Sequence, residues 1–396
     1  MSVPQGPDAR TIPAFLSLAG EKCWAGRIAL LHARVAGSPR YGRLLAQRHA
    51  AEFALEKARR GLGLSADEAL LATRVANLAA LDAGLVASGK VRFRAALATA
   101  LDGDATIIPL LHLHRTAMLH EAAGFSVRYA GFEDGAPFDL LIAREGASAE
   151  IACDTFSAEA GRFVRRAAWM RLIDRIDPDL QTWLAAHPGR YLLKMTLPNG
   201  LRDSGEDGGA AALAELHQRI NAMLSASRRA DYDEAAVLRL DPLMLTAAQA
   251  DENGLMSGLR QEFGPEAQLA VTGGGRGVLV LAARAGSENE VATAMRRRLA
   301  AIAPARLTGT RPGILAMFIE DTDRLEWRLL REHLTLEGEA RQFLTDPAAR
   351  SVVAITCASR FELCREAGAE SAMRFRNPAH PAARSAALAP AVLSTV

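Results

Sequence analysis

The 396-residue sequence lacks any apolar run of the ~18 residues that a membrane-spanning helix needs. Its opening, MSVPQGPDAR, lacks the basic and then apolar pattern of a secretory signal peptide. The four cysteines form no CxxC pair, which argues against a structural zinc site. Cys153 and Cys357 lie in apolar runs, as reduced core thiols do. We therefore expect a cytoplasmic protein that does not associate with membranes.

Strong net charge is also missing. The formal charge is only +2, so no bulk attraction to nucleic acid is implied. Residues 20–60 nevertheless hold nine Lys or Arg against three Glu, and this stretch fits either a surface that lies along DNA or RNA or an exposed helix face with mixed charges. Aromatic residues make up 5% and alanine is abundant, a bias more typical of a GC-rich bacterial genome than of a function.

Two common catalytic signatures are absent as well. The sequence contains no GxSxG nucleophile motif. The glycine-rich TGGGRG at 272–277 lacks the Gly-Lys-Ser/Thr ending of a phosphate-binding loop and predicts a hairpin turn. The histidines His112, His114 and His120 lie in an apolar helical pattern, where His112 and His114 point apart, so we expect surface or hydrogen-bonded side chains rather than a metal site.

The chain is long enough for two or three domains. Residues 1–105 read as a helical region, in which Ser65 and Glu68 form a capping box at the start of a helix. Residues 106–200 change to a mixed pattern of helix and strand. Residues 207–396, beyond a polar and glycine-rich loop, read as an α/β domain.

The middle region has the order helix, three strands, helix, strand. The helix ends near Gly124, the second and third strands flank a turn at 144–146, and Ser157 is placed to cap the next helix. The fourth strand is RYLLKMTLP at 190–198. The fold class predicted for this region is therefore an α/β core of the form α-β-β-β-α-β.

Acidic side chains gather on the second and third strands of this core. Residues two apart in a strand share a face, so Glu150, Ala152 and Asp154 point the same way, whereas Ile151 points into the core. Asp139 lies in the neighbouring strand, within reach across the pair. Paired carboxylates at this spacing suit Mg²⁺ or Mn²⁺, which would activate water and stabilise a phosphate under attack.

The segment resembles the restriction-endonuclease-like superfamily, PD-(D/E)xK. PFDLLI resembles its PD strand with one residue inserted, and IACDTFSAEAGR is similar to a third strand followed by a short loop and an arginine-bearing helix. The resemblance places Asp139 on the metal-binding aspartate, Ala152 on the second acid, Asp154 on the lysine and Arg162 on the helix arginine. It covers about 90 of the 396 residues and places Leu113 where the family's first helix has a glutamate.

The change from lysine to Asp154 bears most on activity. At ~4 Å and an effective dielectric near 20, two unit charges interact by roughly 4 kcal/mol. Reversing the sign beside a phosphate therefore opposes catalysis by up to about 8 kcal/mol. On this basis the mechanism of the family is predicted to be lost.

A rearranged active site is the alternative. Asp139, Glu150 and Asp154 would then form a three-carboxylate metal site, and Lys194 in the fourth strand would supply the cation. Three arginines, Arg162, Arg165 and Arg166, are predicted in the first turns of the next helix. There they would contact phosphates or form an ordinary exposed face.

Three functions remain open from the sequence. The first is a catalytically inactive nuclease-like protein that binds nucleic acid or acts as a scaffold, with no cofactor. The second is a Mg²⁺- or Mn²⁺-dependent nuclease that uses the rearranged carboxylate site. The third is a protein-interaction module with no role on nucleic acid, which the near-neutral net charge favours.

Overall fold

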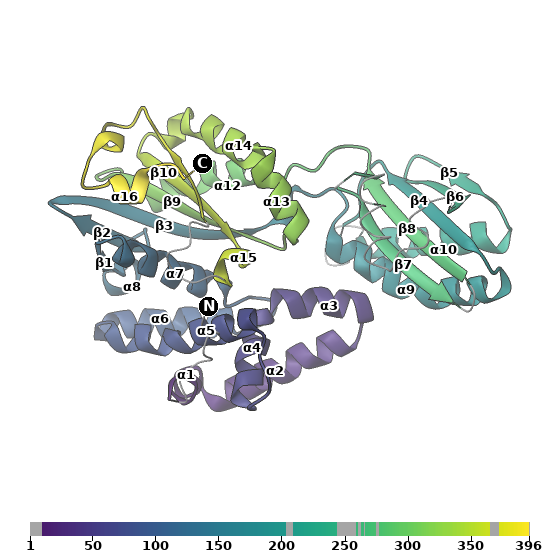
Figure 1. Ribbon diagram of the computed structural model, residues 1–396, viewed down its shortest axis with the longest axis horizontal. Helices are drawn as coiled ribbons and strands as arrows, with labels where there is room; N and C mark the ends of the chain where they lie inside the picture. The colour runs from purple at the N-terminus through teal and green to yellow at the C-terminus, as the bar shows by residue number, and fades with distance from the viewer. Residues whose placement is uncertain are drawn as a thin grey trace. The chain divides into compact units, whose positions relative to one another are not determined.

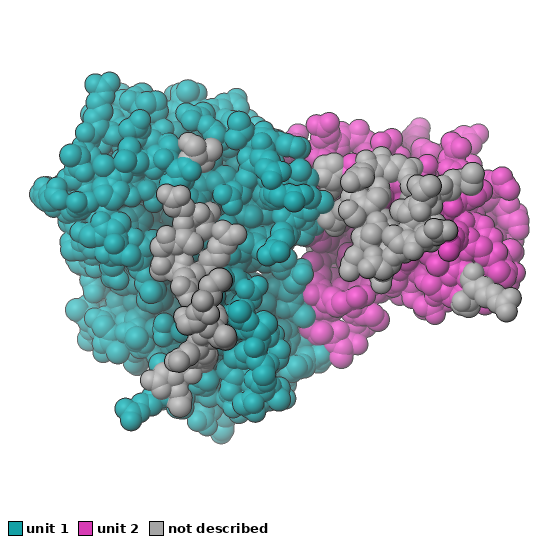
Figure 2. All heavy atoms as spheres, viewed as in Figure 1, with its two compact units in different colours: residues 1–34, 45–160, 292–396 teal, residues 35–44, 161–291 magenta. Residues whose placement is uncertain are grey.

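The chain forms two compact units, shown in different colours in Figure 2. The structure, a computed structural model, describes residues 10–202, 209–243, 259, 263–264, 266–274, 277–364 and 372–395. Unit 1 comprises residues 1–34, 45–160 and 292–396, and unit 2 comprises residues 35–44 and 161–291. Each unit combines helices with one mixed sheet, which confirms the α/β class. Residues 106–200, expected to form one core, are divided between the units.

The N-terminal third is helical, as predicted. Its helices are α1 (Thr11–Ala19), α2 (Glu21–Ala36), α3 (Pro39–Arg48), α4 (Ala50–Arg59), α5 (Ala66–Gly84), α6 (Ala87–Ala100) and α7 (Ile108–Ala122). The capping box of α5 is confirmed, because Ser65 Oγ accepts from Glu68 N while the Glu68 carboxylate accepts from Ser65 N. Residues 35–44, which include the end of α2 and the first part of α3, are counted in unit 2. Phe15, Leu55 and Phe93, each with no exposed surface, lie in a core of unit 1.

The sheet of unit 1 has the strand order β1-β2-β3-β9-β10-β11. Its strands are β1 (Ser126–Arg128), β2 (Leu140–Arg144), β3 (Ala147–Ser157), β9 (Gly313–Glu320), β10 (Val352–Ser359) and β11 (Met373–Arg376). β1, β2 and β3 pair antiparallel in sequence, whereas β3, β9 and β10 run parallel and β11 is antiparallel to β10. The apolar strands expected near 313–320 and 352–359 are therefore confirmed as buried parallel strands.

Helices cover both faces of this sheet (Figure 1). α7 packs on the face that carries Ala149 and Ile151, where Leu113 and Ala117 complete a buried apolar cluster. The other face carries α12 (Val291–Arg306), which connects to β9. The remaining elements of unit 1 are α8 (Ala130–Glu133), α13 (Arg324–Glu332), α14 (Thr335–Leu344), α15 (Arg360–Leu363), α16 (Ala389–Val392) and the 3₁₀ turns η1 (Ala158–Gly161, whose last residue is counted in unit 2), η3 (Pro347–Ala349) and η4 (Pro381–Arg384).

Unit 2 contains a second sheet, with the order β5-β6-β4-β8-β7. Its elements are α9 (Arg166–Ala186), β4 (Arg190–Leu197), α10 (Gly209–Ser225), β5 (Ala230–Tyr232), β6 (Val237–Pro242), β7 (Gln268–Gly274) and β8 (Gly277–Ala285). Trp169 and Leu172 of α9 pack with Ile220 of α10 against Leu193 and Leu281 of the sheet. The hairpin expected around 272–277 is confirmed by the antiparallel pairing of β7 and β8, although residues 275–276 lie outside the described residues.

Two sequence predictions about the middle region are wrong. The strand expected as the fourth of the core, 190–198, is β4, and it pairs with β6 and β8 rather than with β3. The strand that pairs with β3 in parallel is β9. The helix expected directly after Ser157 is also interrupted: Ser157 Oγ accepts from Glu159 N at 3.1 Å, but it opens only η1, and α9 begins at Arg166.

Candidate functional site

The candidate carboxylates lie where the antiparallel strands β2 and β3 meet. Leu140 pairs with Ile151, and Asp139 N donates to Ile151 O at 2.9 Å, so Asp139 directly precedes β2 beside the second half of β3. Its Oδ2 accepts from Cys153 N at 2.6 Å. The aspartate is thus fixed against the backbone of β3 before any other partner is considered.

The two faces of β3 carry the residues that its alternation predicts. Ala149 and Ile151 belong to the apolar cluster under α7, with Cys153 packed against it. Glu150 and Asp154 point the other way, and both bond to the polypeptide of α12 or its following loop. Ala152, between them on this face, has no exposed surface. The predicted acids therefore share a face, with a buried methyl group at its centre.

Asp139 is paired with an arginine from the end of α12. Arg306 Nη2 donates to both carboxylate oxygens at 2.8 Å, and its Nε donates to Pro137 O at 2.6 Å. Burial raises the pKa of Asp139, and the positive charge of Arg306 opposes that rise. Both oxygens that could face a metal ion are therefore occupied by a guanidinium.

Asp154 is paired with a second arginine of α12. Arg298 forms a two-pronged contact, with Nε on Oδ2 and with Nη2 on Oδ1 at 2.9 Å. This hydrogen bonding raises the pKa of Arg298 above its already high value. Bidentate guanidinium–carboxylate pairs are among the stronger charged contacts in proteins. The anion at the position of the family's lysine is thus neutralised from within the fold.

Glu150 is completely buried and bonds to the loop that follows α12. Its Oε2 accepts from Thr308 N at 2.9 Å, and its Oε1 accepts from the hydroxyls of Thr308 and Thr310. Arg311 lies 3.7 Å away. A buried carboxylate requires such partners, since an unpaired one is costly. Glu150 therefore fixes the turn between α12 and β9.

The three acids consequently have separate partners rather than one shared ligand. Among the residues that the structure describes, no group of three or more His, Cys, Asp or Glu is placed to hold a metal ion. Two histidines of α7 likewise bond to the protein itself, in this case to backbone carbonyl groups. His112 Nε2 donates to Ala316 O at 2.9 Å, and His120 Nδ1 donates to Thr116 O at 2.8 Å.

The remaining predicted site residues lie in unit 2. Lys194 is on β4, where it lies 3.5 Å from Asp241 and 5.3 Å from the centre of the Phe263 ring. Since β4 is part of the second sheet, Lys194 is not on the strand next to β3. The cation in contact with the acids comes instead from α12.

The three predicted phosphate-binding arginines flank the start of α9. Only Arg166 lies within the helix, and Arg165 is its N-cap residue. Arg162, in the segment between η1 and α9, is 5% exposed. All three have polar or electrostatic partners within the protein. A continuous basic helix face is therefore not formed by these residues.

Sequence reasoning missed the residues that occupy the acidic face. They are Arg298 and Arg306 of α12 and Thr308 just after it. A signal was present, because the two arginines are about two helical turns apart in a segment that precedes a buried strand. No nearby sequence feature, however, indicates that this helix packs against β3.

Three comparisons with known proteins returned no match: no family model matches the chain, and neither the curated proteins nor the solved structures contain a match. Among the described residues, no helix has both the length and the apolar character to cross a membrane.

Proposed function

We propose that this chain is a nuclease-like protein that does not hydrolyse phosphodiesters and that acts by binding or assembly. The observation that supports the proposal is that α12 and the loop after it bond to all three acids of this face. Asp139 is held by Arg306, Asp154 by Arg298, and Glu150 by Thr308.

The order of elements in unit 1 supports a nuclease-like core. α7, β1, β2 and β3 are followed, after residues 161–291, by α12 and then β9. With those residues treated as an insertion, and apart from the four-residue helix α8 between β1 and β2 and the turn η1 after β3, the order is α-β-β-β-α-β, and β9 runs parallel to β3. Glu290 N donates to Gly161 O at 2.6 Å, so the insertion begins and ends at one place. This arrangement replaces the one expected from the sequence.

The chemistry of the face supports the loss of activity. A Mg²⁺ ion needs carboxylate oxygens with free lone pairs and room for water. Asp139 has three of its roughly four lone-pair sites filled, two by Arg306 and one by Cys153 N, so a metal ion could bind both oxygens only by displacing Arg306. Ala152 supplies no ligand at the second acidic position. A metal ion would also have to displace two guanidinium groups that already neutralise the acids.

A cleavage assay tests this proposal. Purified protein is incubated with single- and double-stranded DNA and RNA in Mg²⁺ or Mn²⁺, beside Asp139→Ala and the exposed control Asp179→Ala. We expect no metal-dependent cleavage by any of the three. Cleavage by wild type and Asp179→Ala that is lost in Asp139→Ala would overturn the proposal and favour the rearranged nuclease.

The partner in the proposed binding role is either nucleic acid or another protein. A net charge of +2 and the burial of Arg162 favour protein assembly over binding to a duplex. Filter binding from about 50 to 200 mM salt separates the two, since phosphate contacts give a steep fall in affinity. We expect weak retention with a shallow slope. Tight, steeply salt-dependent retention would assign a nucleic-acid role instead.

A further inference from the structure

Unit 1 contains a cavity of about 380 Å³ at the ends of β9 and β10. Because β3, β9 and β10 run parallel, their carboxyl ends meet at this edge of the sheet. Ligands of open α/β sheets commonly bind at such an edge. The volume lies in the range of small-molecule sites, roughly 300–1,000 Å³. The cavity is separate from the acidic face under α12, and none of Asp139, Glu150 and Asp154 lines it.

The walls of the cavity are largely apolar and partly aromatic. Phe318 comes from β9, Ile108 from α7, Leu71 from α5, and Phe361 and Leu363 from α15. Aromatic and aliphatic walls of this kind accept the face of a planar ring, because stacking tolerates many ring types.

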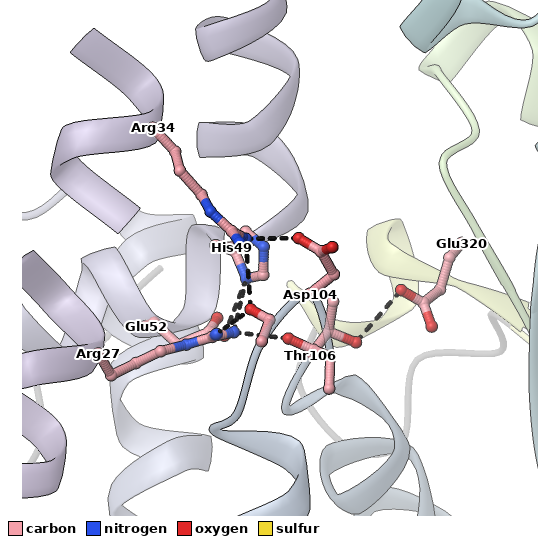
Figure 3. A network of polar contacts seen from close by, with 9 residues as sticks. Arg27, Arg34, His49, Glu52, Asp104, Thr106 and Glu320 are labelled. Atoms are coloured by element: carbon pink, nitrogen blue, oxygen red, sulfur yellow. Dashed lines mark hydrogen bonds and ion pairs between the residues drawn. The ribbon is translucent and has the colours of Figure 1, made fainter. Parts of the chain in front are cut away.

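A carboxylate pair lies at the sheet end of the cavity. Glu320 Oε2 accepts from Thr106 Oγ1 at 3.3 Å (Figure 3), and the adjacent Asp321 accepts from Ser157 Oγ at 2.6 Å. Arg48 of α3 lies 3.6 Å from Asp321. Burial, followed by the charge of Asp321, raises the pKa of Glu320 to about 7. Glu320 is thus a buried carboxyl group that accepts hydrogen bonds from the side chains of Thr106 and Thr155.

The loop that carries Thr106 is fixed by a buried network. Arg27 donates to Gly103 O at 2.8 Å and to Ala105 O at 2.5 Å, and it also contacts His49 and Glu52 (Figure 3). Arg27 and Glu52 are 3% and 0% exposed. Since these groups are enclosed, the position of the Thr106 hydroxyl relative to Glu320 is set before any ligand arrives.

Arginines also line the cavity. Arg324, the first residue of α13, is exposed and has no hydrogen bond or ion pair with the residues that the structure describes. Arg360 stacks over the Phe361 ring at 4.8 Å. The cavity therefore offers carboxylates at the strand ends, aromatic walls and an exposed guanidinium.

We propose that this cavity binds a single nucleotide, with the N–H edge of its base on Glu320, its ring against Phe361, and its phosphate on Arg324. A purely apolar ligand would give neither Glu320 nor Arg324 a further polar contact, and a simple anion would meet two carboxylates. A ligand that carries both N–H donors and an anion matches the carboxylates and the arginine. This inference goes beyond the proposed function and does not depend on it.

Calorimetric titration of the full chain tests the site. The probes are GMP, AMP, CMP and UMP, with guanosine and inorganic phosphate as partial ligands. We expect at least one monophosphate to bind more tightly than either partial ligand. Glu320→Gln should weaken it roughly tenfold or more, as for a lost base contact. Arg324→Ala should weaken the monophosphate but not guanosine, and Arg328→Ala, one turn further along α13 and outside the cavity, should change nothing.

The pH dependence gives a second readout. A base N–H donates more strongly to the ionised form of Glu320, so affinity should rise from pH 6 to pH 8, by up to about tenfold. The charged groups that line the cavity around Glu320 are Asp321, Arg48, Asp67, Glu68, Arg324 and Arg360. Glu320→Gln should remove the rise. No binding of any monophosphate, or binding unchanged in both Glu320→Gln and Arg324→Ala, would overturn the inference and leave the cleavage assay unaffected.

Discussion

Arg306 donates from a single nitrogen, Nη2, to both carboxylate oxygens of Asp139, at 2.8 Å each, across 167 positions of sequence. The pair joins the end of α12 to the start of β2. A carboxylate that the strand pattern offers to a metal ion is therefore a structural partner between helix and sheet. The contribution of this ion pair to the free energy of unfolding can be measured separately from any activity.

Arg306→Ala should lower the free energy of unfolding by about 1–3 kcal/mol, because it leaves a largely buried carboxylate without its cation. The side chains are 32% and 22% exposed, so the loss is smaller than for a fully enclosed pair. Urea unfolding followed by circular dichroism measures it. The matched control is Arg341→Ala, whose exposed pair with Glu337 on α14 should cost no more than about 0.5 kcal/mol. Equal losses in the two variants would contradict the structural role of Arg306.

Glu150 should contribute more through hydrogen bonds than through charge. Glu150→Leu leaves Thr308 N without an acceptor, and an orphaned buried donor costs about 1–3 kcal/mol. Glu150→Gln keeps one acceptor oxygen for Thr308 and should cost less than the Leu variant. The same unfolding experiment compares them. A Leu variant as stable as wild type would show that the turn after α12 does not need Glu150.

Local patterns predicted the elements that depend on neighbouring residues. The capping box at Ser65 and the shared face of Glu150 and Asp154 follow from spacing alone, and both hold in the structure. The partner of β3 did not follow from spacing. The apolar pattern of 190–198 suits any buried strand, and nothing within it states which sheet it joins. The true neighbour, β9, begins more than 150 residues after β3.

The helix after Ser157 shows how packing overrides a local signal. Ser157 forms the expected cap, but Gly161 lies so close to the chain leaving unit 2 that a Cβ there would be 2.4 Å from Val291 Cα. Only glycine fits at position 161, and the helix starts again at Arg166. The roles of Arg298 and Arg306 in α12 were missed because they also depend on tertiary packing. In the sequence alone, these arginines look like those of an exposed basic helix face.

Acid should destabilise unit 1 through two histidines of α7. Burial lowers the pKa of His112 and of His120 to about 4 each, below the ordinary 6.5. The folded state therefore binds fewer protons than the unfolded state between pH 4 and 6.5, and stability is lost as the pH falls through that range. Each histidine accounts for at most about 3 kcal/mol. His112→Gln should reduce the slope of unfolding free energy against pH between 6.5 and 4, and an unchanged slope would contradict this assignment.

Glu320 should act with the opposite sign. Its pKa is raised to about 7, so between pH 4.5 and 7 the folded state binds more protons than the unfolded state. The contribution of this carboxyl is therefore most favourable below pH 4.5 and is lost as the pH rises through 7. Glu320→Gln cannot ionise, and its melting temperature relative to wild type should be higher at pH 8 than at pH 5.

The matched comparison for Glu320 is Asp179→Asn on α9. Hydrogen bonds from His217 and Asn221 lower the pKa of Asp179, so the stability it contributes is present at neutral pH and is lost as the pH falls. The Asn variant should lose melting temperature at pH 8 relative to wild type, where the Gln variant gains it. Because pH 5 and pH 8 both lie above the ordinary pKa of 3.8 for this carboxyl group, the loss in the Asn variant should be the same at the two pH values. If the melting temperature of Glu320→Gln relative to wild type is likewise the same at both, Glu320 is not the group that titrates at the end of β9.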